Sequence, residues 1–184
     1  SWQYKGTLLT EKRPGIRTFE CPDFFPLDGK FAAIAAWMCH RDEGGRYQMT
    51  RCYIGDFDGK SLTVESEQWL DFGSNFYAVQ TFEHQGRRVA IGWVSDFYQE
   101  HRNVKNGAYG SYALPRELSI KQNRLYMKPA AECYQLLGEV IFETSGEKKI
   151  PYTKLPGNCF YVKARLGGDG DFKLLLAKEG KDGL

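Results

Sequence analysis

Residues 31–39 read FAAIAAWMC, an unbroken apolar run of small and large side chains. A run of this length, bounded by turn residues, predicts a strand that is buried on both faces. The turn residues DEGG follow at 42–45, and residues 47–55 suit the partner strand of a hairpin. The sequence around this run therefore predicts an antiparallel sheet.

Period-two segments separated by turn residues continue on both sides of this hairpin. They predict further strands at residues 2–9, 61–67, 75–82, 87–94, 111–122 and 124–128. Short antiparallel strands joined by hairpin turns are typical of a sandwich, a barrel or a propeller. The fold class that the residues predict is all-β.

A change of pattern divides the chain into two expected domains. Residues 129–137, PAAECYQLL, form the one stretch that predicts a helix, and a short one. Beyond it the alternation resumes at residues 158–166 and 171–178. We therefore expect one domain over residues 1–128, the connecting helix, and a second domain over 138–184. The second domain has too few strands to close a sheet sandwich by itself.

Composition and charge argue against several classes of function. The formal net charge of +2 gives no electrostatic case for binding nucleic acid or an anionic membrane, and no apolar run is long enough for a membrane span. The five cysteines lack paired spacing. We therefore expect isolated buried thiols, which favour a reducing, cytoplasmic location, and no disulfide framework. The three histidines are scattered, so no metal or other cofactor is expected.

The stretch ECPDFF at residues 20–25 places one carboxylate, Glu20, among apolar neighbours. Apolar surroundings disfavour the charged form of a carboxyl group and raise its pKa, which suits a proton donor. A glutamate on a solvated surface needs no such neighbours. Glu20 is therefore a candidate general acid.

Four other stretches carry residues that could form a site. They are CYIGDFDGK (52–60), DFGSNFYAVQTF (71–82), RRVAIGWVSDF (87–97) and ALPRELSI (113–120). Taken singly, each has a structural interpretation: the aromatic residues, Trp93 and Phe97 included, could fill a core or lie at a sheet edge. For Arg116 and Glu117 we favour an ion pair that holds two strands together.

Taken together and in order, these stretches resemble glycoside hydrolase family 32, whose invertases, sucrose-6-phosphate hydrolases, levanases and inulinases split β-fructofuranosides. Members typically carry stretches like WECPDFF, DxGxDFYAxQTF, GWMSDW and LPRELS. Residues 1–128 match by motif, and residues 138–184 match only by pattern. The resemblance implies a five-bladed β-propeller, which the chain enters at about the third blade, followed by the start of a β-sandwich.

The resemblance also implies roles for individual residues. Such enzymes act with retention: an Asp nucleophile attacks the anomeric carbon while an acid protonates the leaving oxygen, with the two carboxyl groups about 5–5.5 Å apart. Glu20 matches the acid/base. Asp23 and Arg116 are expected to support the site, with a structural role favoured for both. The expected substrate-binding residues are Cys21, Asn75, Tyr77, Trp93 and Phe97.

The chain departs from the family pattern in several places. The family's nucleophile motif, like WMNDPNG, and its RDP motif both precede the EC motif, and neither occurs in these residues. Arg41-Asp42-Glu43 follows Glu20 and leads into a turn, so we exclude it. Asn75 stands where the family usually has Asp, and Phe97 where it often has Trp, which leaves the substrate preference open. We expect the chain alone to be catalytically silent.

The favoured interpretation is a portion of a retaining β-fructofuranosidase that acts on sucrose, sucrose 6-phosphate or a fructan. The alternatives are a non-catalytic carbohydrate-binding or interaction module, and a fructosyltransferase, which passes the same intermediate to a sugar. Upstream NDPNG and RDP motifs would separate enzyme from module, and product analysis would separate hydrolysis from transfer. Uncovered strand edges near residues 2–9 and 172–176 predict pairing with another copy or with the missing half.

Overall fold

The computed structural model describes residues 1–184 except 74, 96–106, 108, 147–159, 170 and 172–184. Its backbone divides into two compact units, residues 1–136 and residues 137–184. The strands described below all lie in the first unit. Among the described residues, no helix has the length and apolar character needed to cross a bilayer.

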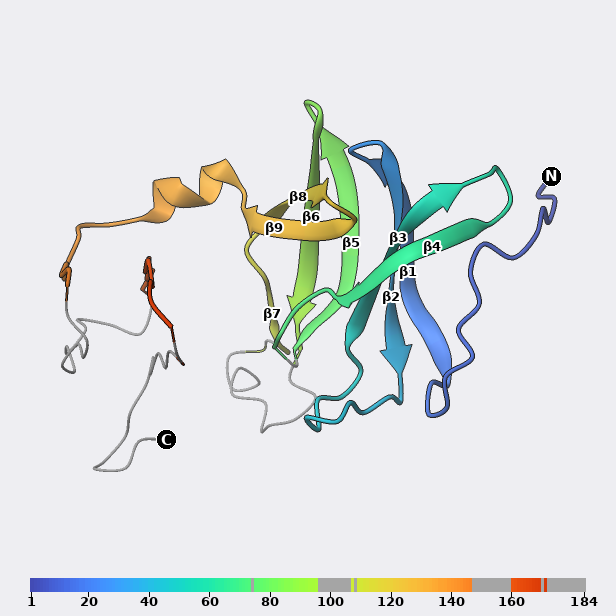
Figure 1. Ribbon diagram of the computed structural model, residues 1–184, viewed down its shortest axis with the longest axis horizontal. Coiled ribbons are helices and arrows are strands. Elements are labelled where there is room, and N and C mark those ends of the chain that lie inside the picture. The colour runs from blue at the N-terminus through green and yellow to red at the C-terminus, as the bar shows by residue number, and fades with distance from the viewer. Residues whose placement is uncertain (74, 96–106, 108, 147–159, 170, 172–184) are drawn as a thin grey trace. The chain divides into compact units, whose positions relative to one another are not determined.

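The first sheet of this unit is an antiparallel meander of four strands (Figure 1). In order they are β1 (Thr18–Leu27), β2 (Lys30–Met38), β3 (Thr50–Phe57) and β4 (Leu62–Trp69). Strand β2 contains all but the last residue of the apolar run FAAIAAWMC, and its residues 32–37 are each at most 7% exposed. The prediction of a strand buried on both faces is confirmed.

The second sheet repeats this pattern with a short additional strand. Its main path is β5 (Phe76–His84), β6 (Arg87–Val94), β8 (Arg116–Lys121) and β9 (Arg124–Pro129), and β7 (Ser111–Tyr112) pairs with β6. All pairs are antiparallel. Four-stranded meanders of this kind are the blades of a β-propeller, so the predicted fold class is confirmed.

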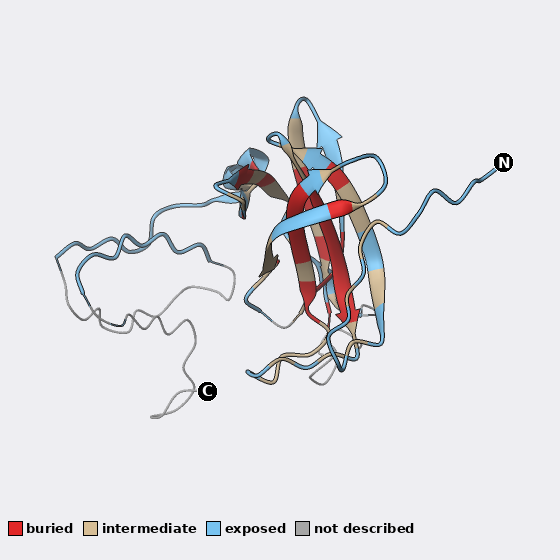
Figure 2. Ribbon diagram, turned by 45° about the vertical axis from the view of Figure 1, so that its right-hand side comes forward, coloured by how far each residue is buried: buried red, intermediate tan, exposed pale blue. Residues whose placement is uncertain are grey.

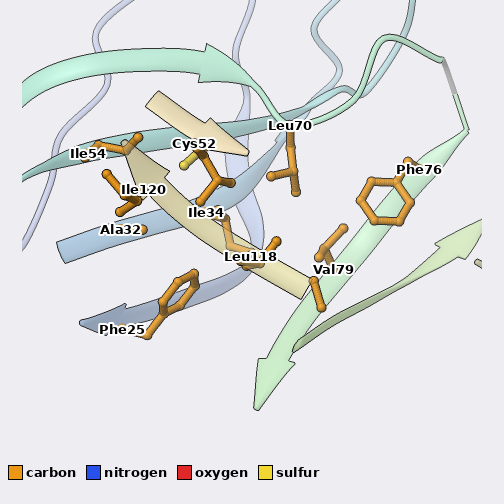
Figure 3. Close-up of a cluster of buried hydrophobic side chains, with 12 residues drawn as sticks. Phe25, Ala32, Ile34, Cys52, Ile54, Leu70, Phe76, Val79, Leu118 and Ile120 are labelled. Atoms are coloured by element: carbon orange, nitrogen blue, oxygen red, sulfur yellow. The ribbon is translucent and has the colours of Figure 1, made fainter. Parts of the chain in front are cut away.

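The two sheets share one apolar core. Side chains from both sheets point toward one another, with Ile34 and Ile54 from the first and Val79 and Leu118 from the second (Figure 3). Ile34, Ile54 and Val79 are each at most 1% exposed. Buried residues line the strands where the sheets meet, whereas the turns and the N-terminal segment are largely exposed (Figure 2). Burial of these side chains holds the two blades together.

Polar side chains add specific links between the sheets. The Gln68 side-chain amide bonds both backbone groups of Leu125: Nε2 donates to the carbonyl at 3.0 Å, and Oε1 accepts from the N–H at 2.9 Å. Asp28 accepts from the backbone N–H of Ile120 at 2.7 Å. Because these bonds satisfy strand-edge groups, they fix the position of one sheet against the other.

Three tight hairpins have two central residues with positive φ, the geometry that matches the twist of paired strands. They join β1 to β2, β5 to β6, and β8 to β9. The central pairs are Asp28-Gly29 (50° and 80°), Gln85-Gly86 (52° and 74°) and Gln122-Asn123 (49° and 57°). Asp-Gly is a strong sequence signal for such a turn, and it could have identified β1 before the structure did.

Strand β1 is one of several differences from the sequence prediction. The strands predicted from the alternation do not include residues 18–27, and β1 contains Pro22 and Pro26, which cannot donate backbone hydrogen bonds to a neighbouring strand. Proline is tolerated here because β1 is the first strand of its sheet and lacks a second neighbour in it. The single strand expected at 111–122 is instead interrupted between β7 and β8, where Pro115 cannot donate a backbone hydrogen bond.

The prediction of a strand at residues 2–9 is also wrong. Trp2 and Tyr4 are 105% and 82% exposed, and this segment pairs with no strand in the described residues. Its end is nevertheless held: Leu8 and Leu9 pack on the outer face of the first sheet, and the carbonyl of Leu8 accepts from the N–H of Leu62. Alternation makes a strand feasible, but a strand also needs a partner for its backbone groups.

The second unit is described in part. The 3-10 helix η2 (Ala131–Leu136) precedes it, within the segment where the sequence predicts a short helix. Residues 160–166 form no strand, contrary to the alternation at 158–166, since no neighbouring backbone pairs with them in the described residues. The expected edge at 172–176 lies outside the described residues. Its assignment to the start of a β-sandwich stays a prediction.

The cysteines of the described residues are free thiols with different environments. Cys52 lies in the core, and burial raises its pKa to about 12. Cys21 and Cys39 are exposed, so the expectation that all the thiols are buried is wrong. Both lie next to backbone irregularities at one end of the sheets, and Cys21 is part of the site described below.

Candidate active site

Glu20 lies beside a β-bulge in β1. It pairs with Ala36 of β2, and the next pair in the register is Asp23 with Ile34. Cys21 and Pro22 therefore oppose the single residue Ala35, and Cys21 has a φ of 48°. Such a bulge bends a strand and re-aims a side chain, and bulges occur often beside active sites. A positive φ at a residue other than glycine is a local strain that the surrounding structure must hold.

Strand β5 has a similar β-bulge near its start. Tyr77 pairs with Trp93 of β6, and the next pair is Gln80 with Ile91, so Ala78 and Val79 form the bulge. Ala78 has a φ of 50°. Glu20 and Tyr77 thus each directly precede a bulge residue whose φ is positive. They lie on β1 and β5, the first strands of the two sheets. Both strands begin at the same end of the unit, at the bottom of Figure 1.

The two bulges bring Glu20 and Tyr77 into contact. The Tyr77 hydroxyl donates a hydrogen bond to Glu20 Oε2, across 57 residues of sequence. Tyr77 is 5% exposed, and burial, followed by the bond to Glu20, raises its pKa far above the usual value. Tyr77 therefore stays protonated and acts as a donor. Glu20 is half-buried.

Further hydrogen bonds lock the bulges against each other. Asp23 Oδ2 accepts from both the backbone N–H and the hydroxyl of Thr81, each at 2.7 Å. Gln80 Nε2 donates to the carbonyl of Cys21 at 3.1 Å. Asp23 thus ties β1 to β5. Cys21, the residue that follows Glu20 in the sequence, is exposed. These bonds hold the bulge conformations that orient Glu20.

Trp93 and Asn75 lie at the same end of the second sheet. Trp93, cross-strand from Tyr77, donates from Nε1 to the carbonyl of Tyr109 at 3.1 Å. The carbonyl of Asn75 accepts from the N–H of Ser95 at 2.8 Å. The Asn75 Oδ1 and Ser95 Oγ atoms are buried without a hydrogen-bond partner among the described residues. Phe97, the remaining expected substrate-binding residue, lies outside the described residues.

Arg116 pairs with a different acid from the one that its sequence neighbour suggested. Its guanidinium binds Asp71 at 2.5 Å and lies 3.9 Å from the centre of the Phe76 ring. Glu117 instead lies near Arg87 and Lys128. The expected Arg116–Glu117 pair is wrong because adjacent strand residues point to opposite faces. Arg116 therefore anchors the segment that leads into β5 and Tyr77.

The hairpin of residues 39–49 also reaches this end of the sheets, and sequence reasoning assigned it no role. Arg46 donates to the carbonyl of Phe72 at 2.8 Å, and the Thr50 hydroxyl donates to the carbonyl of Phe76 at 3.2 Å. Tyr47 lies between these two anchors in the sequence. Its only sequence signal is an aromatic residue directly after a turn.

A separate groove lies away from Glu20. Its volume is about 970 Å³, and it runs between β4 and β9. Leu70, Asp71, Tyr112 and Met127 line it, whereas Glu20 and Tyr77 do not. The groove is large enough for a small ligand, but the candidate acid and its hydrogen-bond donor lie elsewhere. We therefore assign the candidate chemistry to the Glu20–Tyr77 pair. No cluster of His, Cys, Asp or Glu suited to a metal ion occurs in the described part of the chain.

The contact between Tyr77 and Glu20 predicts a specific loss on Tyr77→Phe. In the complete protein that contains this chain, we expect kcat to fall about 10- to 100-fold, the contribution of one hydrogen bond to a charged group. The thermal midpoint should change little, since the ring remains packed. Tyr126→Phe, at a tyrosine of β9 that is 49% exposed, is the matched control. Equal kcat for Tyr77→Phe and the unsubstituted protein would contradict the role.

Comparisons with known proteins identify the family of this chain. The family model described as "Glycosyl hydrolases family 32 N-terminal domain" matches residues 1–129. A sucrose-6-phosphate hydrolase from Vibrio alginolyticus is 30% identical over 188 aligned residues, covering 96% of this chain and 37% of that protein. The chain thus spans about a third of the length of such a relative.

Solved structures with the same fold give a consistent result. A β-fructofuranosidase of family 32 from Bombyx mori matches 72% of this chain and 30% of its own, with a TM-score of 0.64 and 30% identity. A glycoside hydrolase of family 32 from Bifidobacterium adolescentis matches 65% of this chain and 20% of its own, with a TM-score of 0.58 and 41% identity.

Proposed function

Because the chain belongs to glycoside hydrolase family 32, we propose that it is the portion of a retaining β-fructofuranosidase that supplies the acid/base, Glu20. The observation that carries this proposal is the pair of matched bulges, which aims Glu20 at the buried Tyr77 hydroxyl. A carboxyl group held by a fixed donor, on a residue that is only half-buried, suits proton transfer to a bound substrate.

The proposed reaction has two steps. A carboxylate nucleophile attacks the anomeric carbon of fructose, and Glu20 protonates the oxygen of the departing sugar. The ionised Glu20 then removes a proton from water, which attacks the same carbon and releases fructose with its original configuration. Tyr77 keeps donating to Glu20 through both steps and thereby stabilises its charged form between them.

The nucleophile must come from residues other than those in this sequence. The family places it in a motif like NDPNG, which these residues lack. The chain by itself should therefore not hydrolyse fructosides, since the covalent route needs both carboxylates. Asn75, Trp93 and Phe97 are proposed to line the fructose site, and Cys21 to lie beside Glu20. Asp23 and Arg116 are proposed to hold the strands that carry them.

Product analysis of the complete protein tests this proposal. We expect release of free fructose from sucrose, sucrose 6-phosphate or a fructan, and NMR should detect the β-anomer first. Transfer of fructose to a second sugar would instead identify a fructosyltransferase. Saccharide binding without turnover would identify a non-catalytic module. Appearance of the α-anomer first would contradict the retaining mechanism.

We also propose that the chain associates with the remaining propeller blades. A blade normally covers the apolar faces of its neighbours, and Trp2 and Tyr4 are exposed here. Ultracentrifugation of the isolated chain should therefore detect self-association that rises with concentration. Addition of the complementary N-terminal portion should convert these species into a single complex. A monomer across a wide concentration range, indifferent to that portion, would contradict this proposal.

A further inference from the structure

Thr50, the first residue of β3, is a buried polar residue in line with Glu20. The register pairs Glu20 with Ala36 and Ala36 with Thr50, so these residues form one row across β1, β2 and β3. Residues paired directly across strands have their side chains on the same face of a sheet. This face packs against the second sheet, since Ile34 and Cys52, each two residues from a member of the row, belong to the shared core. Thr50 is 3% exposed.

The hydroxyl of Thr50 serves a backbone group at the edge of the second sheet. Strand β5 is the first strand of that sheet, with β6 as its neighbour. The carbonyl of Asn75 accepts from the N–H of Ser95, directly after β6. Because successive carbonyls of an antiparallel strand point to opposite sides, the carbonyl of Phe76 points away from β6. A carbonyl in such a place needs a partner from another element, and Thr50 Oγ1 donates to it at 3.2 Å.

Thr50 also holds the segment that leads into β5. Its backbone carbonyl accepts from the N–H of Leu70 at 2.9 Å. The two bonds thus fix both Leu70 and Phe76 to the start of β3. Tyr77 follows Phe76 directly and precedes the bulge residue Ala78, whose φ is 50°. Backbone of this kind persists only where the surrounding structure holds it, so the position of Tyr77 depends on the anchor beside it.

We propose that Thr50 is a positioning residue for the acid/base pair of Glu20 and Tyr77. Its hydroxyl acts through the Phe76 carbonyl and holds the start of β5 where the Tyr77 hydroxyl meets the carboxylate. The inference rests on the proposed function, because the pair affects turnover only if Glu20 transfers a proton. Thr50 acts on the reaction through Tyr77 and not by contact with the sugar, since its own side chain is buried.

Thr50→Val tests this role because it keeps the shape of the side chain and removes the hydroxyl. In the complete protein, kcat for sucrose should fall about 10-fold, since a small displacement of a catalytic group is costly. KM should change little, because no contact with the bound sugar is lost. Thr50→Ser keeps the hydroxyl and should retain most of kcat. Thr63→Val makes the same change at an exposed residue of β4 and is the matched control.

A double-mutant comparison separates positioning from a general loss of stability. If Thr50 acts through Tyr77, Thr50→Val should lower kcat by less than about twofold once Tyr77→Phe has removed the donor. An equal fold-loss in the presence and absence of Tyr77→Phe would overturn the inference. If Tyr77→Phe lowers kcat but Thr50→Val does not, the inference is overturned while the proposed function stands. Thr50→Ala, which also lacks the hydroxyl, replaces Thr50→Val if that variant does not fold.

Amide hydrogen exchange, followed by mass spectrometry, supplies a readout that does not need turnover. Thr50→Val should speed exchange at residues 75–78 of the complete protein, whereas Thr50→Ser and Thr63→Val should not. If sucrose is not hydrolysed but this effect persists, the proposed function fails while the link from Thr50 to β5 stands. Unchanged exchange at these residues in Thr50→Val would overturn the inference.

Discussion

Glu20→Gln should lower kcat of the complete protein by about 10²- to 10⁴-fold, the usual contribution of a positioned proton donor. Glutamine keeps the size of the side chain and can still accept from Tyr77, so the matched bulges should persist. It cannot give a proton to the departing oxygen or take one from water. The loss should therefore fall on turnover, with the thermal midpoint nearly unchanged.

Two comparisons make the Glu20 result specific. Glu83→Gln alters an exposed carboxylate at the far end of β5 and should leave kcat within about twofold, as expected for surface changes. An activated fructoside has a leaving group that departs without a proton. The decrease in kcat caused by Glu20→Gln should therefore be much smaller for this substrate than for sucrose. Near-normal hydrolysis of sucrose by Glu20→Gln would rule out Glu20 as the acid/base.

Gly55→Ala should destabilise the first sheet by about 3 kcal/mol, the upper part of the range for overpacking in a core. Gly55 of β3 lies opposite a bulge of β4: Ile54 pairs with Ser66 and Gly55 pairs with Val64, so Glu65 is the extra residue. A Cβ atom at this position would lie 1.9 Å from the carbonyl oxygen of Thr63 and 2.8 Å from the carbonyl carbon. Because these are backbone atoms, relief requires β3 and β4 to separate.

Urea unfolding of the chain measures this effect, and Gly44→Ala is its control. A Cβ atom at Gly44 would have the flexible Asp42 carboxylate as its nearest neighbour, at 3.5 Å, which is an ordinary contact. The control should change the free energy of unfolding by less than about 0.5 kcal/mol. Equal stability of Gly55→Ala and Gly44→Ala would show that the strand pair can open without cost at this bulge.

Local patterns in the sequence determined much of the secondary structure. The alternation at residues 87–94 predicted β6 with its observed bounds, and the apolar run at 31–39 predicted β2 to within one residue at each end. Both succeed because side-chain direction along a strand is a local property with a period of two. The motif order likewise identified the family, since it needs only the sequence.

Only the tertiary structure decided how the candidate site is assembled. The contact between Glu20 and Tyr77 joins residues 57 positions apart, and it depends on bulges at Cys21 and Ala78, where residues other than glycine adopt positive φ. No local preference predicts such backbone, because its strain is offset by bonds between the sheets, such as Asp23 to Thr81. The sequence by itself thus determined most of the strands, the family and the candidate acid, whereas packing of the two sheets decided which donor faces that acid.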